Sequence, residues 1–209
     1  ASVEILTYAM MLAEDRKANP RDDIVTKLVR ADEEGQLTSD EFGFFVILLA
    51  VAGNETTRNA ITHGMNAFFE NPEQWDLFKN ERPKTMADEV IRWATPVTTF
   101  QRTALKDIEV GGVPVTKGQR VGLFYASANF DEDHYPDPFR FDIHRNPTDQ
   151  LAFGTGRHLC LGAWLARLEV RVTLEELLPR LADIEIVGPV ERLRSNFIRG
   201  IKHLPVQVS

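Results

Sequence analysis

The feature that most constrains the fold is a long helical segment that starts near Thr38 and ends at Asn71-Pro72. Thr38 and Glu41 have the spacing of a capping box, which begins a helix, and a proline ends one. A helix that continues to about Glu70 contains about 30 residues and is roughly 45 Å long, which is enough to cross a whole domain. Its first half is apolar on nearly every side, so we expect this helix to be central.

Shorter helical patterns surround this segment. We expect helices over residues 2–17, 24–34, 73–80, 84–94 and 163–181. The sequence puts Ile24, Leu28 and Val29 on one face of the second of these helices, and Leu165, Leu168, Val172 and Leu177 lie near helical spacing in the last.

Strand patterns are fewer. Short β-branched runs after residue 106 flank a Gly111-Gly112 turn and a Lys117-Gly118 turn, which predicts β-hairpins. Residues 130–150 are rich in proline and Asx residues but keep large aromatic side chains, so we expect a long ordered loop. The alternating tail 184–209 predicts further strands. The fold class is therefore mainly α with a minor β part.

Composition excludes several classes of function. With 43% apolar and 26% charged residues the chain is globular, and a net charge of −7 argues against nucleic-acid binding. One cysteine forms no internal disulfide, which fits a reducing compartment, and no signal peptide opens the chain. The longest apolar run, 42–53, is too short for a transmembrane segment. We expect a cytoplasmic protein. Because the chain opens at Ala1 in helical pattern, we also expect a piece of a longer protein.

The only cysteine lies in "FGTGRHLCLG", residues 153–162. A lone cysteine is usually a small buried apolar residue. Here Gly154, Gly156 and Gly162 surround Cys160, and a helix follows. Glycine lets the backbone approach a flat ligand, and the N-terminus of a helix favours a thiolate over a thiol. The loop thus indicates a thiolate that meets something large and planar.

The pattern F-x-x-G-x-H-x-C-x-G resembles the haem-thiolate signature of the cytochrome P-450 monooxygenases. The resemblance implies haem b as cofactor and O2 as co-substrate, with Cys160 as the proximal metal ligand. It also implies that His158 meets a haem propionate, that Phe153 shields the sulfur, and that Gly156 and Gly162 leave room for the porphyrin. A thiolate ligand pushes electron density onto iron and favours O–O cleavage.

A second motif, "AGNETT", lies late in the long helix. Taken alone it could be a solvent-facing polar patch. It is similar to the oxygen-binding groove of the same family, which implies that Ala52 and Gly53 approach the haem. In that interpretation Thr56 and Glu55 are catalytic and deliver protons, through water, to dioxygen.

The third motif is E-x-x-R, which occurs three times, beginning at Glu55, Glu89 and Glu191. Its spacing puts both side chains on one helix face, and an ordinary surface ion pair is the simplest interpretation. Only Glu89 and Arg92 lie between the other two motifs. They resemble the family's structural pair, which locks onto an arginine of the following loop; Arg140 and Arg145 are both candidates.

The segment after this pair resembles the substrate side of the family's haem. There, Arg102 would meet a propionate, while Asn129 and Asp131 form turns. The substrate-lining residues that the resemblance implies are Val97, Thr98, Thr99 and Phe100.

Together the motifs resemble the C-terminal half of a single cytochrome P-450 domain over residues 1–209, without its N-terminal half. Longer matches such as "RWATPVTTFQRTAL" and "ERLRSNFIRGIKHLPV" resemble the actinobacterial enzymes that oxidise the terminal methyl of the cholesterol side chain. The resemblance implies a small apolar substrate, a sterol or its 3-keto form, and electrons from a ferredoxin and a ferredoxin reductase, with docking near Arg157 and Arg167. The alternatives are a hydroxylase of fatty acids or terpenes, a haem binder without catalysis, and an inactive fragment.

Overall fold

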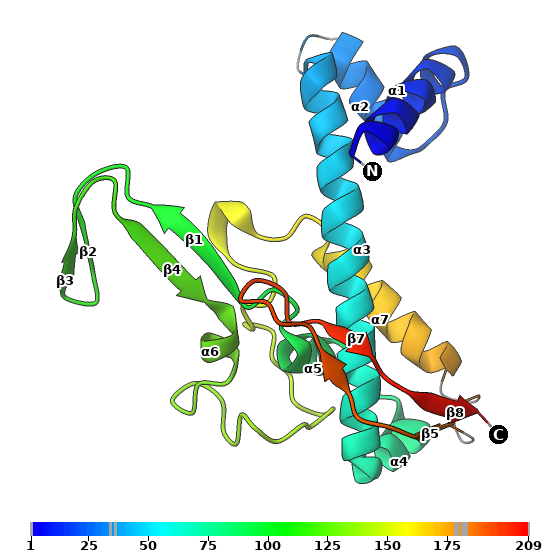
Figure 1. Ribbon diagram of the computed structural model, residues 1–209, viewed down its shortest axis with the longest axis vertical. Helices are drawn as coiled ribbons and strands as arrows, with labels where there is room; N and C mark the ends of the chain where they lie inside the picture. The colour runs from blue at the N-terminus through cyan, green and yellow to red at the C-terminus, as the bar shows by residue number, and fades with distance from the viewer. Residues whose placement is uncertain (1, 34, 36, 178–179, 181–183, 209) are drawn as a thin grey trace. The chain divides into compact units, whose positions relative to one another are not determined.

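The long helix α3 begins and ends close to its predicted limits, at Ser39–Glu70. The capping box is formed at its start: the backbone N–H of Thr38 donates to Glu41 at 2.8 Å, and the N–H of Glu41 donates to the hydroxyl of Thr38 at 3.2 Å. These bonds satisfy donors that a helix start otherwise leaves open. The computed structural model describes residues 2–33, 35, 37–177, 180 and 184–208 (Figure 1).

The other elements follow in chain order. The helices are α1 (Ser2–Ala18), α2 (Ile24–Glu33), α4 (Pro72–Glu81), α5 (Met86–Ala94), α6 (Tyr125–Asn129), the 3-10 turn η1 (Gly156–His158) and α7 (Ala163–Leu177). The strands are β1 (Thr99–Thr103), β2 (Ile108–Val110), β3 (Val113–Val115), β4 (Arg120–Phe124), β5 (Ile184–Ile186), β6 (Glu191–Arg192), β7 (Ile201–His203) and β8 (Val206–Val208). This confirms a mainly α chain with a minor β part. None of the described helices has both the length and the apolarity to cross a lipid bilayer.

The chain divides into two units, Ala1–Glu55 and Thr56–Ser209. In the first unit, α1, α2 and the start of α3 pack around a small apolar core of Ala9, Ala13, Val29 and Phe42. Gly43 on α3 lies against the side chains of Leu6 and Met10, which would have to shift to admit a Cβ at this position.

The exposed side chains of the first unit show the limit of pattern-based prediction. Phe44, Leu48 and Val51 of α3 are 58–70% exposed, although their apolar pattern predicts burial. Ile24 of α2 is likewise 61% exposed, and Val29 is the buried residue of its predicted face. Apolar side chains tend to be buried, but within the described residues no neighbouring segment covers Phe44, Leu48, Val51 or Ile24.

The second unit holds the larger core, in which α3, α4, α5 and α7 meet. Phe68 is at its centre and contacts the rings of Trp75, Phe78 and Phe141 at 5.3–5.7 Å between centroids. Helix α7 buries Val170 and Leu174, whereas Leu165, Leu168 and Val172 are 42–58% exposed. Of the four residues that the sequence places near helical spacing in α7, Leu177 packs on the core.

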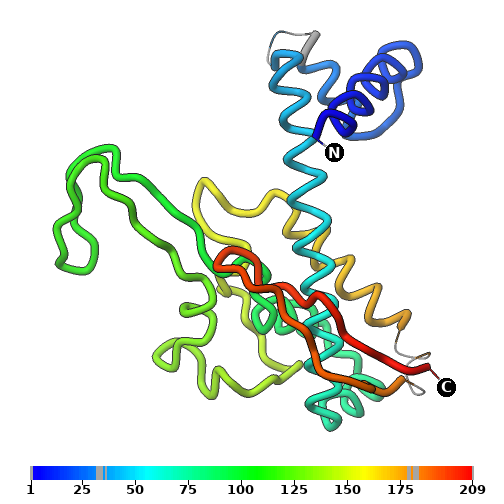
Figure 2. Tube along the Cα trace, viewed as in Figure 1, coloured from blue at the N-terminus to red at the C-terminus, as the bar shows by residue number. Residues whose placement is uncertain are grey.

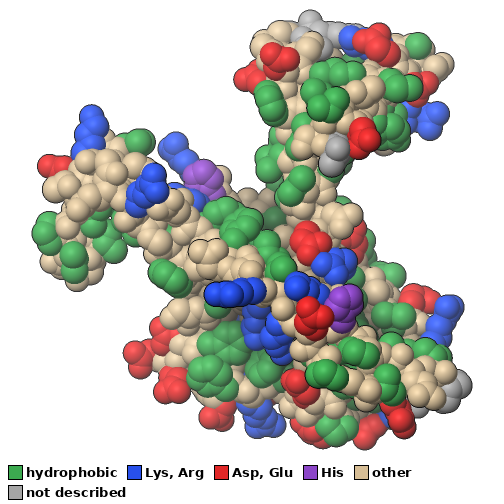
Figure 3. All heavy atoms as spheres, viewed as in Figure 1, with side chains coloured by type: hydrophobic (Ala, Val, Ile, Leu, Met, Phe, Trp, Pro, Cys, Tyr) green, Lys and Arg blue, Asp and Glu red, His purple; other side chains and the backbone are tan. Residues whose placement is uncertain are grey.

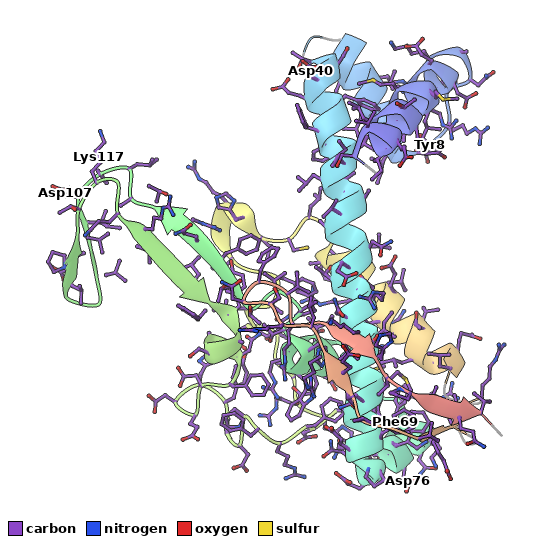
Figure 4. All side chains as sticks on the ribbon, viewed as in Figure 1. Tyr8, Asp40, Phe69, Asp76, Asp107 and Lys117 are labelled. Carbon is purple, nitrogen blue, oxygen red and sulfur yellow. The ribbon has the colours of Figure 1, made fainter. Side chains whose placement is uncertain are left out.

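The strands form antiparallel pairs, β1 with β4, β2 with β3, β5 with β8 and β6 with β7. The Gly111-Gly112 turn joins β2 and β3, as predicted, and both glycines have positive φ. The Lys117-Gly118 turn differs from its prediction, because β4 pairs back with β1 and not with β3. The carboxylate of Asp107 closes this turn by accepting the backbone N–H of Lys117 at 2.7 Å (Figure 4).

Residues 130–155 contain no helix or strand, as the sequence predicts for most of this segment. Tyr135 and Phe141 are buried, and Phe139 is 67% exposed but stacks on Phe130 at 5.4 Å between centroids. This long loop leads directly to Cys160 and is held in place by polar contacts with α5.

Candidate functional site

The loop around Cys160 is closed by backbone hydrogen bonds. The N–H of Cys160 donates to the carbonyl of Phe153 at 2.9 Å, and the N–H of Leu159 donates to the carbonyl of Gly156 at 3.1 Å. The N–H of Ala163 then donates to the carbonyl of Cys160 at 3.3 Å and starts α7. The sequence therefore places the thiol one turn before a 15-residue helix.

Two glycines shape this loop. Gly154 and Gly156 have φ of 69° and 65°, a conformation that residues with a side chain rarely adopt. A Cβ on Gly156 would meet no atom within 4 Å, so its glycine is required by the backbone turn and not by crowding inside the chain. Gly162 differs: a Cβ there would lie 4.0 Å from the sulfur of Cys160.

Several side chains of the loop are exposed. They include Cys160 itself, His158 in η1, and Leu159 and Leu161 at 60% and 75% exposure. An exposed thiol between two exposed leucines is unlike the ordinary buried cysteine. It presents a sulfur within an apolar surface.

Phe153 is tied to α5 through Arg167. The guanidinium of Arg167 lies 4.7 Å from the centre of the Phe153 ring, and its Nε donates to the carboxylate of Asp88 at 2.7 Å. A cation over an aromatic face is attractive. Arg167 thus fixes Phe153 next to the Cys160 loop, and its charge is already paired within the chain, whereas Arg157 is exposed.

Glu89 and Arg92 of α5 form a fully buried ion pair. Arg92 Nε and Nη2 donate to the two carboxylate oxygens of Glu89 at 2.7 and 2.8 Å, and neither side chain is exposed. Of the two arginines left open by the sequence, Arg145 reaches this pair, with Nε 3.4 Å from Glu89. Arg140 contributes its carbonyl, which accepts from Arg145 Nη2 at 3.2 Å.

Aromatic rings enclose the same arginine. The guanidinium carbon of Arg92 lies 5.0 Å from the ring centre of Phe130, 5.4 Å from that of Tyr135 and 5.9 Å from that of Trp93. Burial is the main cause that raises the pKa of Tyr135, whose hydroxyl donates to Asp149 at 3.1 Å. The ion pair is therefore a packed centre of the fold, away from solvent.

Asn129 links this centre to the loop that carries the cysteine. Its carbonyl accepts from Arg92 Nη1 at 2.7 Å, its side-chain oxygen accepts the N–H of Leu151 at 2.7 Å, and its amide donates to Thr95 at 2.9 Å. The sequence predicts only a turn at Asn129 and Asp131. Asp131 does form a turn by accepting the N–H of Asp133, but Asn129 is fully buried and joins three segments.

The predicted substrate-lining residues lie at the start of β1. Val97 pairs with Ile198 as an isolated bridge. The hydroxyls of Thr98 and Thr99 both donate to the carbonyl of Asn196, at 2.7 and 2.9 Å, so they are bound to the C-terminal segment. Phe100 is 43% exposed.

Arg102 lies on β1 opposite Val121 and is half-buried. Its Nη1 donates to the neighbouring carbonyl of Gln101 at 3.0 Å, and its guanidinium lies 5.9 Å from the ring centre of Phe100. These contacts direct the guanidinium toward the Phe100 end of the strand.

The groove motif is divided between the units. Ala52, Gly53 and Glu55 belong to the first unit, and Thr56 to the second, all on α3. Ala52 and Gly53 are exposed, and Glu55 and Thr56 are half-buried. A Cβ on Gly53 would meet no atom within 4 Å. The i,i+3 and i,i+4 spacing puts Ala52, Glu55 and Thr56 on one side of the helix.

A family model described as "Cytochrome P450" matches residues 7–182. The chain belongs to the cytochrome P450 family. It is 55% identical to a steroid C26-monooxygenase of Mycolicibacterium smegmatis and 59% identical to one of Rhodococcus jostii, over 99% of this chain in each case. A methyl-branched lipid omega-hydroxylase of Mycobacterium bovis is 48% identical over 98% of the chain. This P450 chain spans 44–49% of the length of these curated relatives.

Solved P450 structures have the same fold. CYP109E1 of Bacillus megaterium, in complex with testosterone, matches with a TM-score of 0.92 at 34% identity, over 99% of this chain and 59% of that one. CYP268A2 of Mycobacterium marinum, in complex with pseudoionone, matches with a TM-score of 0.91 at 41% identity, over 98% of this chain and 50% of that one.

The donor set of the P450 chain fits a haem. Within the described residues there is no cluster of three or more His, Cys, Asp or Glu side chains that could hold a metal ion. A single thiolate cannot build a protein-only site, which needs about three or four ligands. Haem supplies four nitrogens of its own, so one exposed cysteine at a glycine-rich turn would be enough to hold it.

Proposed function

We propose that the protein is a haem-thiolate monooxygenase that inserts one oxygen atom of O2 into an unactivated C–H bond of an apolar substrate. The observation that carries this proposal is the Cys160 loop. It presents an exposed thiol one turn before α7, beside glycines with positive φ, in a chain of the P450 family. When bound, haem b with a thiolate ligand supplies the O2-activating chemistry.

Each predicted residue has a role in this proposal. Cys160 would hold the haem iron through its sulfur, Phe153 would shield that sulfur, and His158 and Arg102 would donate to the propionates. Gly156, Gly162, Ala52 and Gly53 allow the porphyrin to approach. Thr56 and Glu55 move protons to the reacting dioxygen, and Val97, Thr98, Thr99 and Phe100 line the substrate side. For Thr98 and Thr99 this lining is by their methyl groups and backbone, because their hydroxyls are bound to Asn196.

The substrate that we propose is a sterol side chain, of cholesterol or its 3-keto form. The names of the relatives at 55–59% identity, steroid C26-monooxygenases, support it. The methyl-branched lipid omega-hydroxylase at 48% identity supports the second candidate, a branched fatty acid. Both are oxidations at the end of a long apolar chain.

The remaining proposals concern the whole protein. We propose a single P450 domain, of which both units are part, in the cytoplasm. Electrons come from a ferredoxin and its reductase, and exposed Arg157 is the residue of this chain that best fits an acidic partner. Arg167 fits less well than the sequence suggests, because Asp88 already pairs with it.

The test is the spectrum of the reduced carbon monoxide complex of the full-length protein. We expect the strongly red-shifted Soret band of thiolate ligation in the wild type and in Thr155→Ser, a control in the same loop. Cys160→Ser should bind less haem and lose the shifted band. A shifted band that survives in Cys160→Ser would contradict the assignment.

Turnover then separates an oxygenase from a haem binder without catalysis. With a ferredoxin pair and cholest-4-en-3-one, we expect a side-chain alcohol in the wild type. Thr56→Ala should consume oxygen with less product. Unchanged coupling in Thr56→Ala would exclude the proton role, and full haem loading without any product from sterol or fatty acid would exclude the oxygenase.

A further inference from the structure

Two buried polar residues of α3 have no role in the site described above. Asn59 is fully buried and His63 is 2% exposed. They are four residues apart, so they lie on one face of the helix, and both are in the second unit. A buried polar side chain costs stability unless it is hydrogen-bonded, which raises the question of what they hold.

Both residues bind the backbone of the C-terminal segment. His63 Nε2 lies 3.0 Å from the carbonyl oxygen of Arg199, and since a carbonyl only accepts, this nitrogen carries the proton and donates. The side-chain oxygen of Asn59 accepts the N–H of Ile201 at 3.3 Å. Figure 2 shows this segment, in orange to red, running past α3.

These bonds join α3 to the β6–β7 loop, residues 193–200. The loop is narrow at its base, where the N–H of Leu193 donates to the carbonyl of Gly200 at 2.8 Å. Gly200 is packed between Leu193 of the loop and Asn59 of α3: a Cβ on Gly200 would lie 3.1 Å from Leu193 and 3.5 Å from the Asn59 side-chain oxygen. The contact with Asn59 is thus close-packed.

The opposite side of the loop is fixed to the segment before β1. Arg199 donates from its backbone to the carbonyl of Pro96 at 2.9 Å and from Nη1 to the carbonyl of Trp93 at 2.7 Å. The N–H of Thr98 donates to the carbonyl of Phe197 at 2.9 Å. The loop is therefore bound on one side to α3 and on the other to residues 93–99.

At the tip of the loop, Phe197 contacts Phe100. Their ring centres are 5.6 Å apart at 76°, an edge-to-face pair, and the rings are 46% and 43% exposed. The hydroxyl of Ser195 accepts the N–H groups of Phe197 and Ile198, both at 3.1 Å, which fixes the turn. Two half-exposed aromatic rings thus border the segment that we propose to line the substrate side.

We propose that Asn59 and His63 are positioning residues that hold the β6–β7 loop so that Phe197 stays against Phe100, and that this position decides which apolar substrates fit. The first part concerns the chain alone. The second part rests on the proposed function, because it requires a substrate beside Phe100. Neither residue touches the reacting atoms in this proposal.

The first part is tested by amide hydrogen exchange in the full-length protein. His63→Leu removes the donor and should raise exchange in residues 193–201 about tenfold, the effect of one buried hydrogen bond. His63→Gln keeps an N–H donor and should return most of the protection. His203→Gln, at an exposed histidine of the same segment, is the control.

Amide exchange in α5 is the internal reference, because a general loss of stability would raise exchange in α5 as much as in residues 193–201. An equal rise in α5 and in residues 193–201, or no rise in the latter, would overturn the proposal. Ser195→Ala is a second variant at an exposed position, which keeps the fold intact and should also raise exchange in residues 193–201.

The second part is tested by the ratio of two dissociation constants, measured from the haem spectrum. The ligands are rigid cholest-4-en-3-one and flexible palmitic acid. A looser loop should admit the flexible ligand relatively better, so His63→Leu and Ser195→Ala should change the ratio about fivefold or more, and His63→Gln should restore it. Equal weakening of both ligands would refute the selectivity role.

The two failures remain distinguishable. If the wild type binds neither ligand, the proposed substrate class is wrong, while the exchange result still decides whether His63 holds the loop.

Discussion

The buried charge of Glu89 provides the sharpest test of the scaffold around the site. Glu89 accepts from Arg92 at 2.7 and 2.8 Å, from the N–H of Asp142 at 3.1 Å and from Arg145 at 3.4 Å. Glu89→Gln keeps the size of the side chain and removes its charge. Arg92, which is fully buried, then has no carboxylate partner among the residues that the structure describes. Removing one partner of a buried ion pair costs about 3–5 kcal/mol, and we expect a loss in that range.

The chain offers a matched control, because Glu191 begins another E-x-x-R sequence. Its side chain is 55% exposed, and it pairs with Lys202 at 3.2 Å. Solvent screens such a pair, so Glu191→Gln should cost under about 1 kcal/mol. Urea unfolding followed by circular dichroism measures both losses as changes in the free energy of unfolding.

Two results would refute the reasoning. One is a loss at Glu89 that equals the loss at Glu191. The other concerns the double variant Glu89→Gln with Arg92→Met, which removes both charges of the fully buried pair and still lets the rings of Phe130 and Tyr135 contact an apolar chain. This variant should be more stable than Glu89→Gln alone; if it is less stable, the cost does not come from the unpaired arginine.

Three further predictions concern other parts of the second unit. Burial, with the nearby charge of Arg199, lowers the pKa of His63 from 6.5 to about 4, so the unfolded chain takes up the proton first as the pH falls. Stability should drop by about 3 kcal/mol between pH 6.5 and pH 4, and in His63→Gln the drop should be smaller by that amount; parallel pH curves would contradict this. Gly64→Ala should cost about 1–3 kcal/mol, since its Cβ would lie 2.7 Å from Val90 Cγ1, and Val90→Ala in the same chain should recover part of the loss in urea unfolding. Asn129→Ala leaves the part-buried N–H of Leu151 without its acceptor and should lower the melting temperature by several degrees, whereas Asn80→Ala, at an exposed asparagine, should leave it unchanged.

Sequence patterns correctly predicted the parts of the fold that depend on interactions between residues close together in the chain. The capping box at Thr38, the proline after Asn71 and the Gly111-Gly112 turn each act through neighbouring residues, and all three are formed. The glycine-rich turn before α7 belongs to the same class. Such signals need no knowledge of what packs against the segment.

Sequence patterns failed to predict the buried face of a helix or the partner of a strand where a segment distant in the sequence determines it. Helix α7 has apolar residues on several sides, and packing against α5 and against Gly64 of α3 selects Val170 and Leu174 as its buried face. The pairing of β4 with β1 is likewise a choice between partners that no turn specifies. Figure 3 shows a related case, in which hydrophobic side chains of the β2–β3 hairpin are exposed on the surface, with Val113 at 62%.

The polar residues of the site show the same division. Arg140 and Arg145 are equivalent in sequence, and the loop geometry alone brings Arg145 to Glu89. Asn59 and His63 belong to no recognised motif, and Asn129 was predicted only as a turn residue, so the burial of these three side chains was not predicted. A signal did exist for the two on α3: polar residues four apart on a helix with a buried apolar face indicate an internal polar contact.

The three E-x-x-R sequences show why spacing in the sequence does not by itself predict a buried ion pair. Their spacing is identical, and it sets only which side chains can meet. The strength of the contact depends on the surroundings: at Glu89 a closed set of donors and rings excludes water, and at Glu191 water competes with Lys202. Burial of that kind is supplied by Phe130, Tyr135 and Asp142, which lie 38 or more residues further along the chain than Arg92. A motif therefore locates the pair, and the energy that makes it a scaffold comes from segments that the motif does not contain.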